Sequence, residues 1–219
     1  MFKKYMEKKF SKRDSKEFNK WREIFQKIVT HWTLGAYIRC RYKVEVIGRE
    51  KLNRNEKYVI AANHVSGFDP FILVFALNMP IAFMAKEQLF EHFWSRVLMD
   101  WCGAFAVNRE KLEVSTIKTA LAVRNSDWKL GIFPQGTRDK GNCIKNISKG
   151  FVALAKASEC DILPVSIIKD DNKKGIRCGK ITIKIGDLIP CGDFQETMDN
   201  WGNAVAALSG LEYVSGSSQ

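Results

Sequence analysis

The chain has 219 residues, 46% of them hydrophobic and 27% charged, so it can bury a sizeable core. This composition excludes a disordered or fibrous protein. The net charge of +11 is uneven, because residues 1–48 hold 13 Lys/Arg against 5 Asp/Glu and the other 171 residues hold 22 against 19. The basic N-terminal segment suits an anionic partner, either a membrane or a nucleic acid.

In the N-terminal segment, apolar residues recur at helical spacing. They are Phe18, Trp21, Phe25, Ile28, Val29, Trp32 and Ala36. Steps of three and four predict one amphipathic helix. A basic helix with aromatic residues on its apolar face can lie among lipid headgroups, although the same face could pack on the protein itself. We expect residues 1–42 to form a membrane-association segment.

Strand-like and helix-like segments alternate after this helix. This predicts an α/β domain over residues 43–211, with a central, mostly parallel sheet flanked by helices, and a flexible tail at 212–219. The expected strands are 43–47, 58–62, 81–85, 104–107, 129–133, 162–168 and 180–185, and the expected helices are 69–77, 87–101, 112–125, 149–159 and 193–211.

No segment predicts a membrane span or a secretory signal. The longest uncharged run, residues 70–85, is interrupted by Asn78 and Pro80 and is shorter than the roughly 20 apolar residues that a span needs. The first residues are charged and lack the apolar core of a signal peptide. We therefore expect a peripheral protein on the cytoplasmic face of a membrane.

The stretch NHVSGFDP at residues 63–70 follows the strand expected at 58–62. It therefore lies at the carboxyl end of a strand, where α/β folds place their sites. Gly67 permits a sharp turn that can bring the carboxylate of Asp69 to the imidazole of His64. Such a carboxylate fixes the tautomer and leaves the other ring nitrogen to accept a proton. Alternatively, the pair is structural and Asp69 caps a helix before Pro70.

The stretch GAFAVNR at residues 103–109 ends an expected strand in Arg109. A guanidinium there suits bidentate capture of a phosphate, although an exposed loop arginine has the same pattern. A later stretch, ILPV at residues 162–165, is an apolar strand with an internal proline. Pro164 predicts an edge strand or a bulge.

The stretch FPQGTR at residues 133–138 follows another apolar strand. Its proline and glycine predict a tight turn that exposes backbone N–H groups. Thr137 and Arg138 add a hydroxyl and a guanidinium, so the turn can bind an anion. An ordinary turn with a solvated arginine is the alternative.

In this order and spacing, the four stretches resemble the blocks of the glycerolipid acyltransferase family, specifically its 1-acyl-sn-glycerol-3-phosphate acyltransferases. Those blocks read roughly NHxSxxD, GxxFxxR, FPEGTR and V/I-x-P-V/I, and the resemblance covers residues 43–189. It implies an α/β acyltransferase domain with acyl-CoA or acyl-carrier protein as co-substrate. It also implies lysophosphatidic acid as the membrane-resident acceptor and phosphatidic acid, made in phospholipid biosynthesis, as the product.

The resemblance also implies a role for each matching residue. His64 would be the general base and Asp69 its orienting partner. The acceptor phosphate would be held by Arg109, Gln135, Gly136, Thr137 and Arg138, with Lys86 as a further candidate, and Asn63, Ser66 and Gly67 would shape the site. Gln135 departs from the family pattern, which has Glu, so it keeps an acceptor oxygen but loses the charge.

Other functions remain open from the sequence. The acceptor could be glycerol 3-phosphate or a lysolipid with another headgroup, because arginines that bind phosphate suit several acceptors. A non-catalytic membrane-binding protein is the alternative from another class. Nucleic acid is not an expected partner, because the body of the chain is nearly neutral. We expect no cofactor or metal, and reduced thiols at the six scattered cysteines.

Overall fold

The structure, a computed structural model, describes residues 10–107, 113–138, 141, 143–171 and 179–216. Seven strands form one sheet in the order β1-β8-β7-β2-β5-β3-β4. Neighbouring strands are parallel except for the antiparallel pair β7–β8. The expected α/β fold with a mostly parallel central sheet is confirmed. The strands are β1 (Tyr42–Ile47), β2 (Tyr58–Ala62), β3 (Ile81–Lys86), β4 (Phe105–Val107), β5 (Lys129–Ile132), β7 (Asp161–Asp170) and β8 (Gly179–Ile185).

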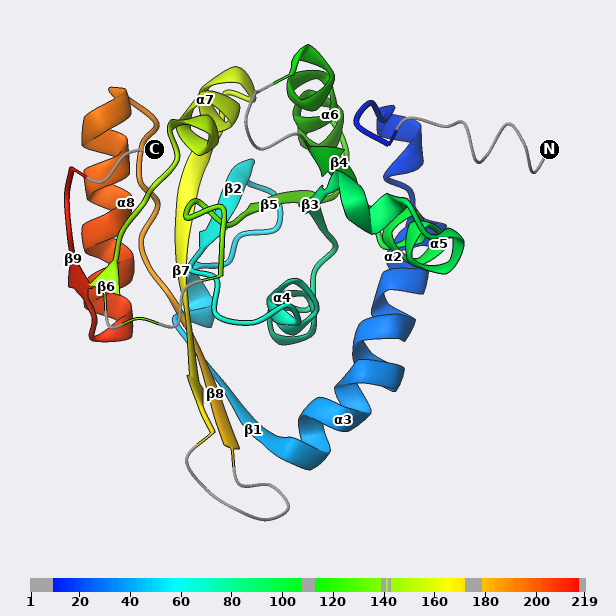
Figure 1. Cartoon of the computed structure of the whole chain (residues 1–219), viewed down its shortest axis with the longest axis horizontal. Coiled ribbons are helices and arrows are strands. Elements are labelled where there is room, and N and C mark those ends of the chain that lie inside the picture. Colours follow the sequence, from blue (N-terminus) through cyan, green and yellow to red (C-terminus); the bar gives the residue numbers. More distant parts are fainter. Residues whose placement is uncertain (1–9, 108–112, 139–140, 142, 172–178, 217–219) are drawn as a thin grey trace.

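Helices cover both faces of this sheet (Figure 1). One face carries α6 (Val114–Arg124), α7 (Lys149–Ala157) and α8 (Phe194–Ser209), and the other carries α4 (Asp69–Leu77). All five residues of β2 are buried. Val59 and Ala61 belong to the hydrophobic core on the side of α6, α7 and α8. Ile60 and Ala62 belong to the core on the side of α4. A strand buried on both faces is expected to read as a continuous apolar run, as β2 does.

The N-terminal segment crosses the α4 side of the molecule from one edge of the sheet to the other (Figure 1). At one edge the N–H of Ala106, in β4, donates to the carbonyl of Phe10 over 3.1 Å. The chain then forms η1 (Ser15–Glu17), α2 (Lys20–Lys27), the π-helical turn η2 (Ile28–Thr33) and α3 (Leu34–Arg41), which leads into β1 at the other edge.

The N-terminal segment is helical as expected, but it is divided into α2, η2 and α3, and the predicted apolar residues do not all lie on one side of it. Phe18 precedes α2 and is buried against Trp128, whereas Trp21 and Trp32 are 76% and 77% exposed. The side that faces the body carries polar Gln26 instead. Its amide group donates to two backbone carbonyls and accepts from one backbone N–H, so its burial is compensated.

A buried charge cluster fixes this segment to α5 (Phe93–Trp101). Nη1 of Arg13 and Nη1 of Arg22 lie 2.8 and 2.9 Å from Oδ1 of Asp100. Burial lowers the pKa of Arg13, and the neighbouring Asp100 carboxylate opposes that change. The backbone N–H of Arg13 also donates to Thr119 on α6 over 2.9 Å. The segment is therefore tied into the body by buried polar contacts.

Three expectations need correction. The helix expected at 87–101 is a 3₁₀ turn, η4 (Glu87–Phe90), followed by α5. Of the two alternatives predicted from Pro164, the edge strand is wrong, because β7 lies between β8 and β2. The bulge is confirmed: residues 163–164 face residues 186–188 between two paired positions, and the missing N–H of proline is tolerated there. Residues 212–213, expected in the tail, form β9 with β6.

The remaining elements lie within two residues of their expected bounds, and a further 3₁₀ turn, η3, follows β1. This turn comprises Arg49–Lys51. Strands β6 (Cys143–Ile144) and β9 (Glu212–Tyr213) form a separate two-stranded sheet. In the part of the chain that the structure describes, no helix has the length and hydropathy needed to cross a bilayer.

Candidate active site

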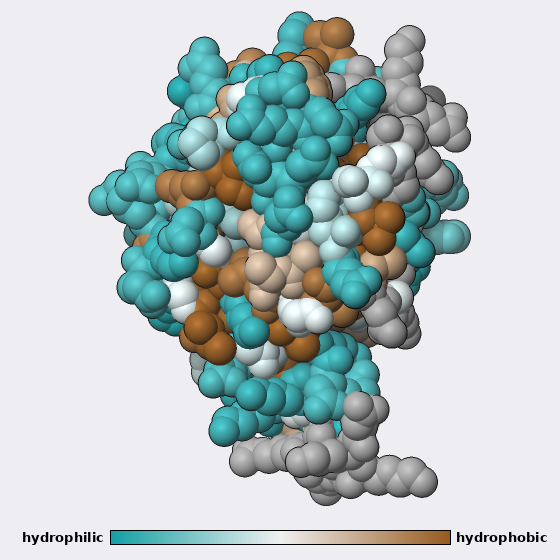
Figure 2. All heavy atoms as spheres, turned by 90° about the vertical axis from the view of Figure 1, so that its left-hand side faces the viewer, coloured by the Kyte–Doolittle hydropathy of each residue, from teal (hydrophilic) through white to brown (hydrophobic). Residues whose placement is uncertain are grey.

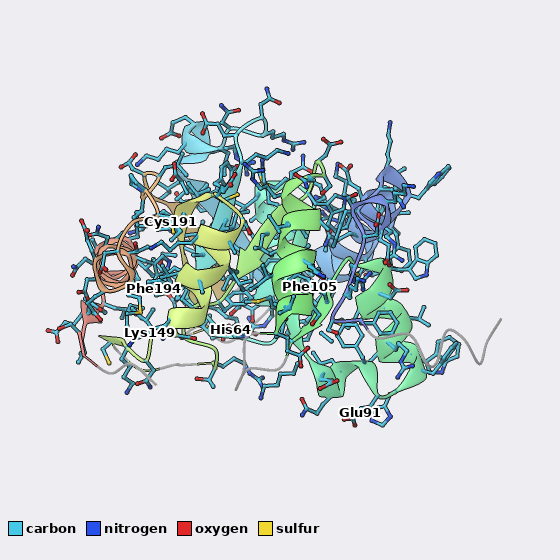
Figure 3. The ribbon with its side chains drawn as sticks, turned by 90° about the horizontal axis from the view of Figure 1, so that it is seen from above. His64, Glu91, Phe105, Lys149, Cys191 and Phe194 are labelled. Carbon is cyan, nitrogen blue, oxygen red and sulfur yellow. The ribbon has the colours of Figure 1, made fainter. Side chains whose placement is uncertain are left out.

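The loop that carries His64 begins where β2 ends. Asn63, the first residue of the loop, donates from its amide to the carbonyl of Ile167 over 3.0 Å and accepts from the N–H of the same residue over 2.7 Å. This pair of bonds holds the loop to β7, the neighbouring strand. His64 therefore projects from the carboxyl end of the sheet, on the same side of the molecule as Lys149 and Glu91 (Figure 3).

The side chains of His64 and Asp69 are in contact. Nδ1 of His64 lies 2.7 Å from Oδ2 of Asp69. The same oxygen accepts the backbone N–H groups of Val65 and Ser66, each over 2.7 Å. Because an ionised carboxylate only accepts hydrogen bonds, Nδ1 carries the proton and Nε2 is left to accept one.

Asp69 is not a helix cap. The N-cap residue of α4 is Phe68, and the Asp69 carboxylate bonds to the loop that precedes the helix. The Asp69 side chain is fully buried, where an unpaired charge would be costly. The imidazole and the two backbone N–H groups compensate this charge. This arrangement holds the imidazole in one orientation, which favours the catalytic interpretation of the pair over the capping one.

An aromatic ring fixes the plane of the imidazole. The rings of His64 and Phe133 stack with centroids 4.1 Å apart and planes 19° apart, and Phe133 in turn stacks on Phe83. The sequence did not identify Phe133 as a site residue. Its position directly after β5 and before the turn at 134–138 was the available signal.

The turn after β5 packs against the histidine loop. Gly136 has φ 67°, a conformation that favours glycine, and its N–H donates to the carbonyl of Phe133 over 2.9 Å. Gln135 is buried, and its Oε1 lies 3.4 Å from the backbone N of His64, from which it accepts a hydrogen bond. A neutral amide supplies this acceptor as well as a carboxylate would, so the contact does not need the charge of Glu.

A cavity of about 620 Å³ opens beside His64. Its walls are mainly apolar and come from α4, β3 and the region around α5, including Phe71, Val74, Met84 and Met99. Lys86, Thr137 and Arg138 line the same cavity and are exposed. The structure therefore brings the proposed base and three of the predicted phosphate-binding residues around one apolar cavity.

Two other lining residues have no signal in the sequence. Gln26 and Cys102 close part of the cavity, and the Gln26 amide donates to the Cys102 carbonyl over 2.8 Å. Burial raises the pKa of the Cys102 thiol to about 12, so the thiol stays neutral. The N-terminal segment thus contributes a wall to the site.

The remaining predicted residues differ in what the structure shows of them. Arg109 lies outside the described residues. The hydroxyl of Ser66 accepts from the N–H of Phe68 over 3.3 Å, within the loop. Gly67 does not have a positive φ, so the turn does not require glycine there. Among the described residues, no three His, Cys, Asp or Glu side chains come together as metal ligands.

Comparisons with known proteins identify the family of this chain. The family model named Acyltransferase matches residues 43–168, more than half of the chain. The chain is 29% identical over 163 residues to a 1-acyl-sn-glycerol-3-phosphate acyltransferase of Bacillus subtilis, covering 74% of this chain and 81% of the relative. It is 30% identical over 161 residues to the enzyme of that name from Streptococcus pneumoniae, covering 70% and 58%.

A third relative and a solved structure complete the comparison. Identity to the 1-acyl-sn-glycerol-3-phosphate acyltransferase of Borreliella burgdorferi is 27% over 132 residues, covering 59% of this chain and 53% of the relative. The chain thus spans little more than half of two of these relatives. The crystal structure of the 1-acyl-sn-glycerophosphate (LPA) acyltransferase from Thermotoga maritima has the same fold, with a TM-score of 0.64, 22% identity and coverage of 85% and 76%. The chain belongs to the acyltransferase family.

Proposed function

We propose that the protein transfers a fatty acyl group from acyl-CoA or acyl-carrier protein to the sn-2 hydroxyl of 1-acyl-glycerol-3-phosphate, giving phosphatidic acid. The observation that carries this proposal is the His64–Asp69 pair beside an apolar cavity that Lys86 and Arg138 also line. The names of the relatives support the choice of acceptor.

The reaction follows from the orientation of His64. Nε2 removes the proton of the acceptor hydroxyl, whose oxygen attacks the thioester carbonyl and forms the new C–O bond. When the tetrahedral intermediate collapses, the C–S bond breaks and protonated His64 returns its proton to the leaving thiolate. Asp69 stabilises the imidazolium in between. The step needs no covalent acyl-enzyme.

Incubation of the purified protein with lysophosphatidic acid and labelled palmitoyl-CoA tests this function directly. We expect labelled phosphatidic acid as the product. Glycerol 3-phosphate and lysolipids with other headgroups should be weaker acceptors in parallel reactions. A protein that acylates one of these better, or none at all, would contradict the proposed acceptor.

Arg138→Ala is expected to raise the KM for lysophosphatidic acid by about tenfold or more, because a charge-assisted hydrogen bond contributes roughly 1.5–3 kcal/mol. The KM for the acyl donor should change less. Arg124→Ala is the matched control, since Arg124 forms an exposed pair with Glu159 at 3.0 Å. Equal KM values for the acceptor in both variants would exclude Arg138 from the phosphate site.

We also propose that the protein lies on a membrane surface through the N-terminal segment. The side chains of α2 and η2 that face away from the body are largely apolar, and Trp94 on α5 is 81% exposed. The exposed apolar residues of α2 and η2 are Trp21, Ile24, Ile28 and Trp32. Large exposed apolar surface of this kind is typical of a site that contacts a membrane or a partner.

The double variant Trp21→Ser/Trp32→Ser should bind vesicles that contain anionic lipid at least about tenfold more weakly, because two apolar side chains no longer enter the lipid. Co-sedimentation measures this change. Val214→Ser is the control. Its side chain is 47% exposed directly after β9, on a side of the molecule where hydrophobic atoms are scattered among hydrophilic ones (Figure 2). Equal sedimentation of both variants would refute the proposed surface.

Point variants are preferable to a deletion for this experiment. Removing the first 38 residues would take Arg13 and Arg22 from Asp100 and Gln26 from the cavity wall. Weaker binding by such a deletion would not separate membrane contact from loss of the fold.

A further inference from the structure

A second cavity lies on the other side of the histidine loop. Its volume is about 380 Å³, and Ser66 and Lys169 are among its lining residues. It shares Gly67 and Arg138 with the apolar cavity, but His64 lines only the apolar one. The loop and Arg138 therefore stand between two cavities of different character.

The second cavity can bind an anion. The ionisable side chains among its described lining residues are Arg138, Lys169 and Asp171, a net charge of +1. Nζ of Lys169 lies 2.9 Å from Oδ2 of Asp171 and 5.1 Å from the centre of the Tyr42 ring. An ammonium group has three N–H donors, so its bonds to Asp171 and to the Tyr42 side chain leave one donor for a ligand.

Gly67 sits where the two cavities meet. Its φ is not positive, so the backbone does not call for glycine. A Cβ built on Gly67 would meet only one described atom within 4 Å, Nη1 of Arg138 at 3.5 Å. A methyl group at this position would therefore touch the Arg138 guanidinium, so the glycine leaves room beside Arg138 where the two cavities meet.

We propose that the second cavity receives the phosphate-bearing carrier of the acyl donor and that Lys169 binds its phosphate. The acyl chain then occupies the apolar cavity, and the thioester reaches His64 through the space beside Gly67. This inference rests on the proposed acyl transfer. It fits both candidate donors, because coenzyme A and acyl-carrier protein both carry the thiol on a phosphopantetheine arm.

The covalent structures of the two substrates assign the second cavity to the donor. In lysophosphatidic acid the phosphate and the reacting hydroxyl sit on neighbouring carbons of one glycerol unit. That phosphate must therefore stay close to His64, where Lys86 and Arg138 line the apolar cavity. In the donor the pantetheine arm separates the phosphate from the thioester, so its anion site should lie outside the cavity that His64 lines. Lys169 lines the second cavity and not that one.

The test compares two unreactive donor analogues, S-hexadecyl-CoA and S-hexadecyl-pantetheine, the second of which lacks phosphate. Lys169→Ala should bind the CoA thioether roughly tenfold more weakly than the unsubstituted protein does, the effect of one charge-assisted contact. Its affinity for the pantetheine thioether should be unchanged, and Lys169→Arg should restore binding of the CoA thioether.

Lys180→Ala is the matched control. Lys180 pairs with Glu45 at 2.7 Å on the neighbouring strand and is not one of the described residues that line either cavity.

Gly67→Ala should unfold at an unchanged temperature but lower kcat/KM for palmitoyl-CoA, because the added methyl group narrows the space beside Gly67 through which the thioester reaches His64. The proposal would be overturned if Lys169→Ala lost the same affinity for both thioethers or lost none. A raised KM for lysophosphatidic acid alone would overturn it as well.

The binding measurement needs no turnover, so the two proposals fail separately. If the unsubstituted protein forms no phosphatidic acid, but Lys169→Ala binds the CoA thioether more weakly than the unsubstituted protein does, the proposed reaction is wrong and the donor site stands. If it forms phosphatidic acid and Lys169→Ala binds both analogues normally, the reaction stands and the donor site is wrong.

Discussion

His64→Ala is expected to lower the rate of acyl transfer by about 10²- to 10⁴-fold, the usual contribution of a positioned general base. The variant should remain folded, because Asp69 keeps the backbone N–H groups of Val65 and Ser66 as hydrogen-bond partners. Labelled phosphatidic acid measures the activity, and thermal unfolding measures the fold.

His92→Ala is the control for this experiment. His92 is exposed and precedes α5, where its side chain makes no capping hydrogen bond. It should transfer acyl groups at the rate of the unsubstituted protein. Normal turnover by His64→Ala would remove the proposed base, and equal loss in both variants would show that the effect is not specific to the site.

Asp100→Ala is expected to lower the free energy of unfolding by about 3–5 kcal/mol, because removing one partner of a buried ion pair leaves an uncompensated charge. Here the carboxylate is almost fully buried, and both Arg13 and Arg22 bond to its Oδ1. Denaturant unfolding followed by tryptophan fluorescence measures the change.

An exposed ion pair supplies the comparison. Glu159→Ala breaks the pair with Arg124, in which the Glu159 side chain is 78% exposed, and should cost less than about 1 kcal/mol. If both variants lose similar stability, the cluster around Asp100 does not hold the N-terminal segment in place.

The sequence predicted the sheet and the contact between His64 and Asp69 because both depend on local patterns. The apolar run at residues 58–62 was enough to predict a strand, and that strand is buried on both faces of the sheet. The spacing of His64 and Asp69 sufficed for their contact, since the residues between them form one short loop. Such signals lie within a few residues of each other along the chain.

Features that depend on distant partners were not predictable in this way. Helical spacing indicates that a helix has an apolar stripe, but not which side of the helix packs on the rest of the protein. Gln26 faces inward because the backbone carbonyls of Ile81 and Cys102, far along the chain, accept its hydrogen bonds. Lys169 lies after the fourth block, and no local pattern marks it. The internal position of the strand at Pro164 likewise depends on the segment that follows β8.

The N-terminal segment has two sides with separate requirements. Its inner side supplies Gln26 to the cavity wall and Arg13 to Asp100, and its outer side presents Trp21 and Trp32. It is therefore not an interchangeable module. A chimera that borrows these helices from a relative should fold only if the inner contacts are transplanted with them, whereas the outer residues can differ without loss of the fold.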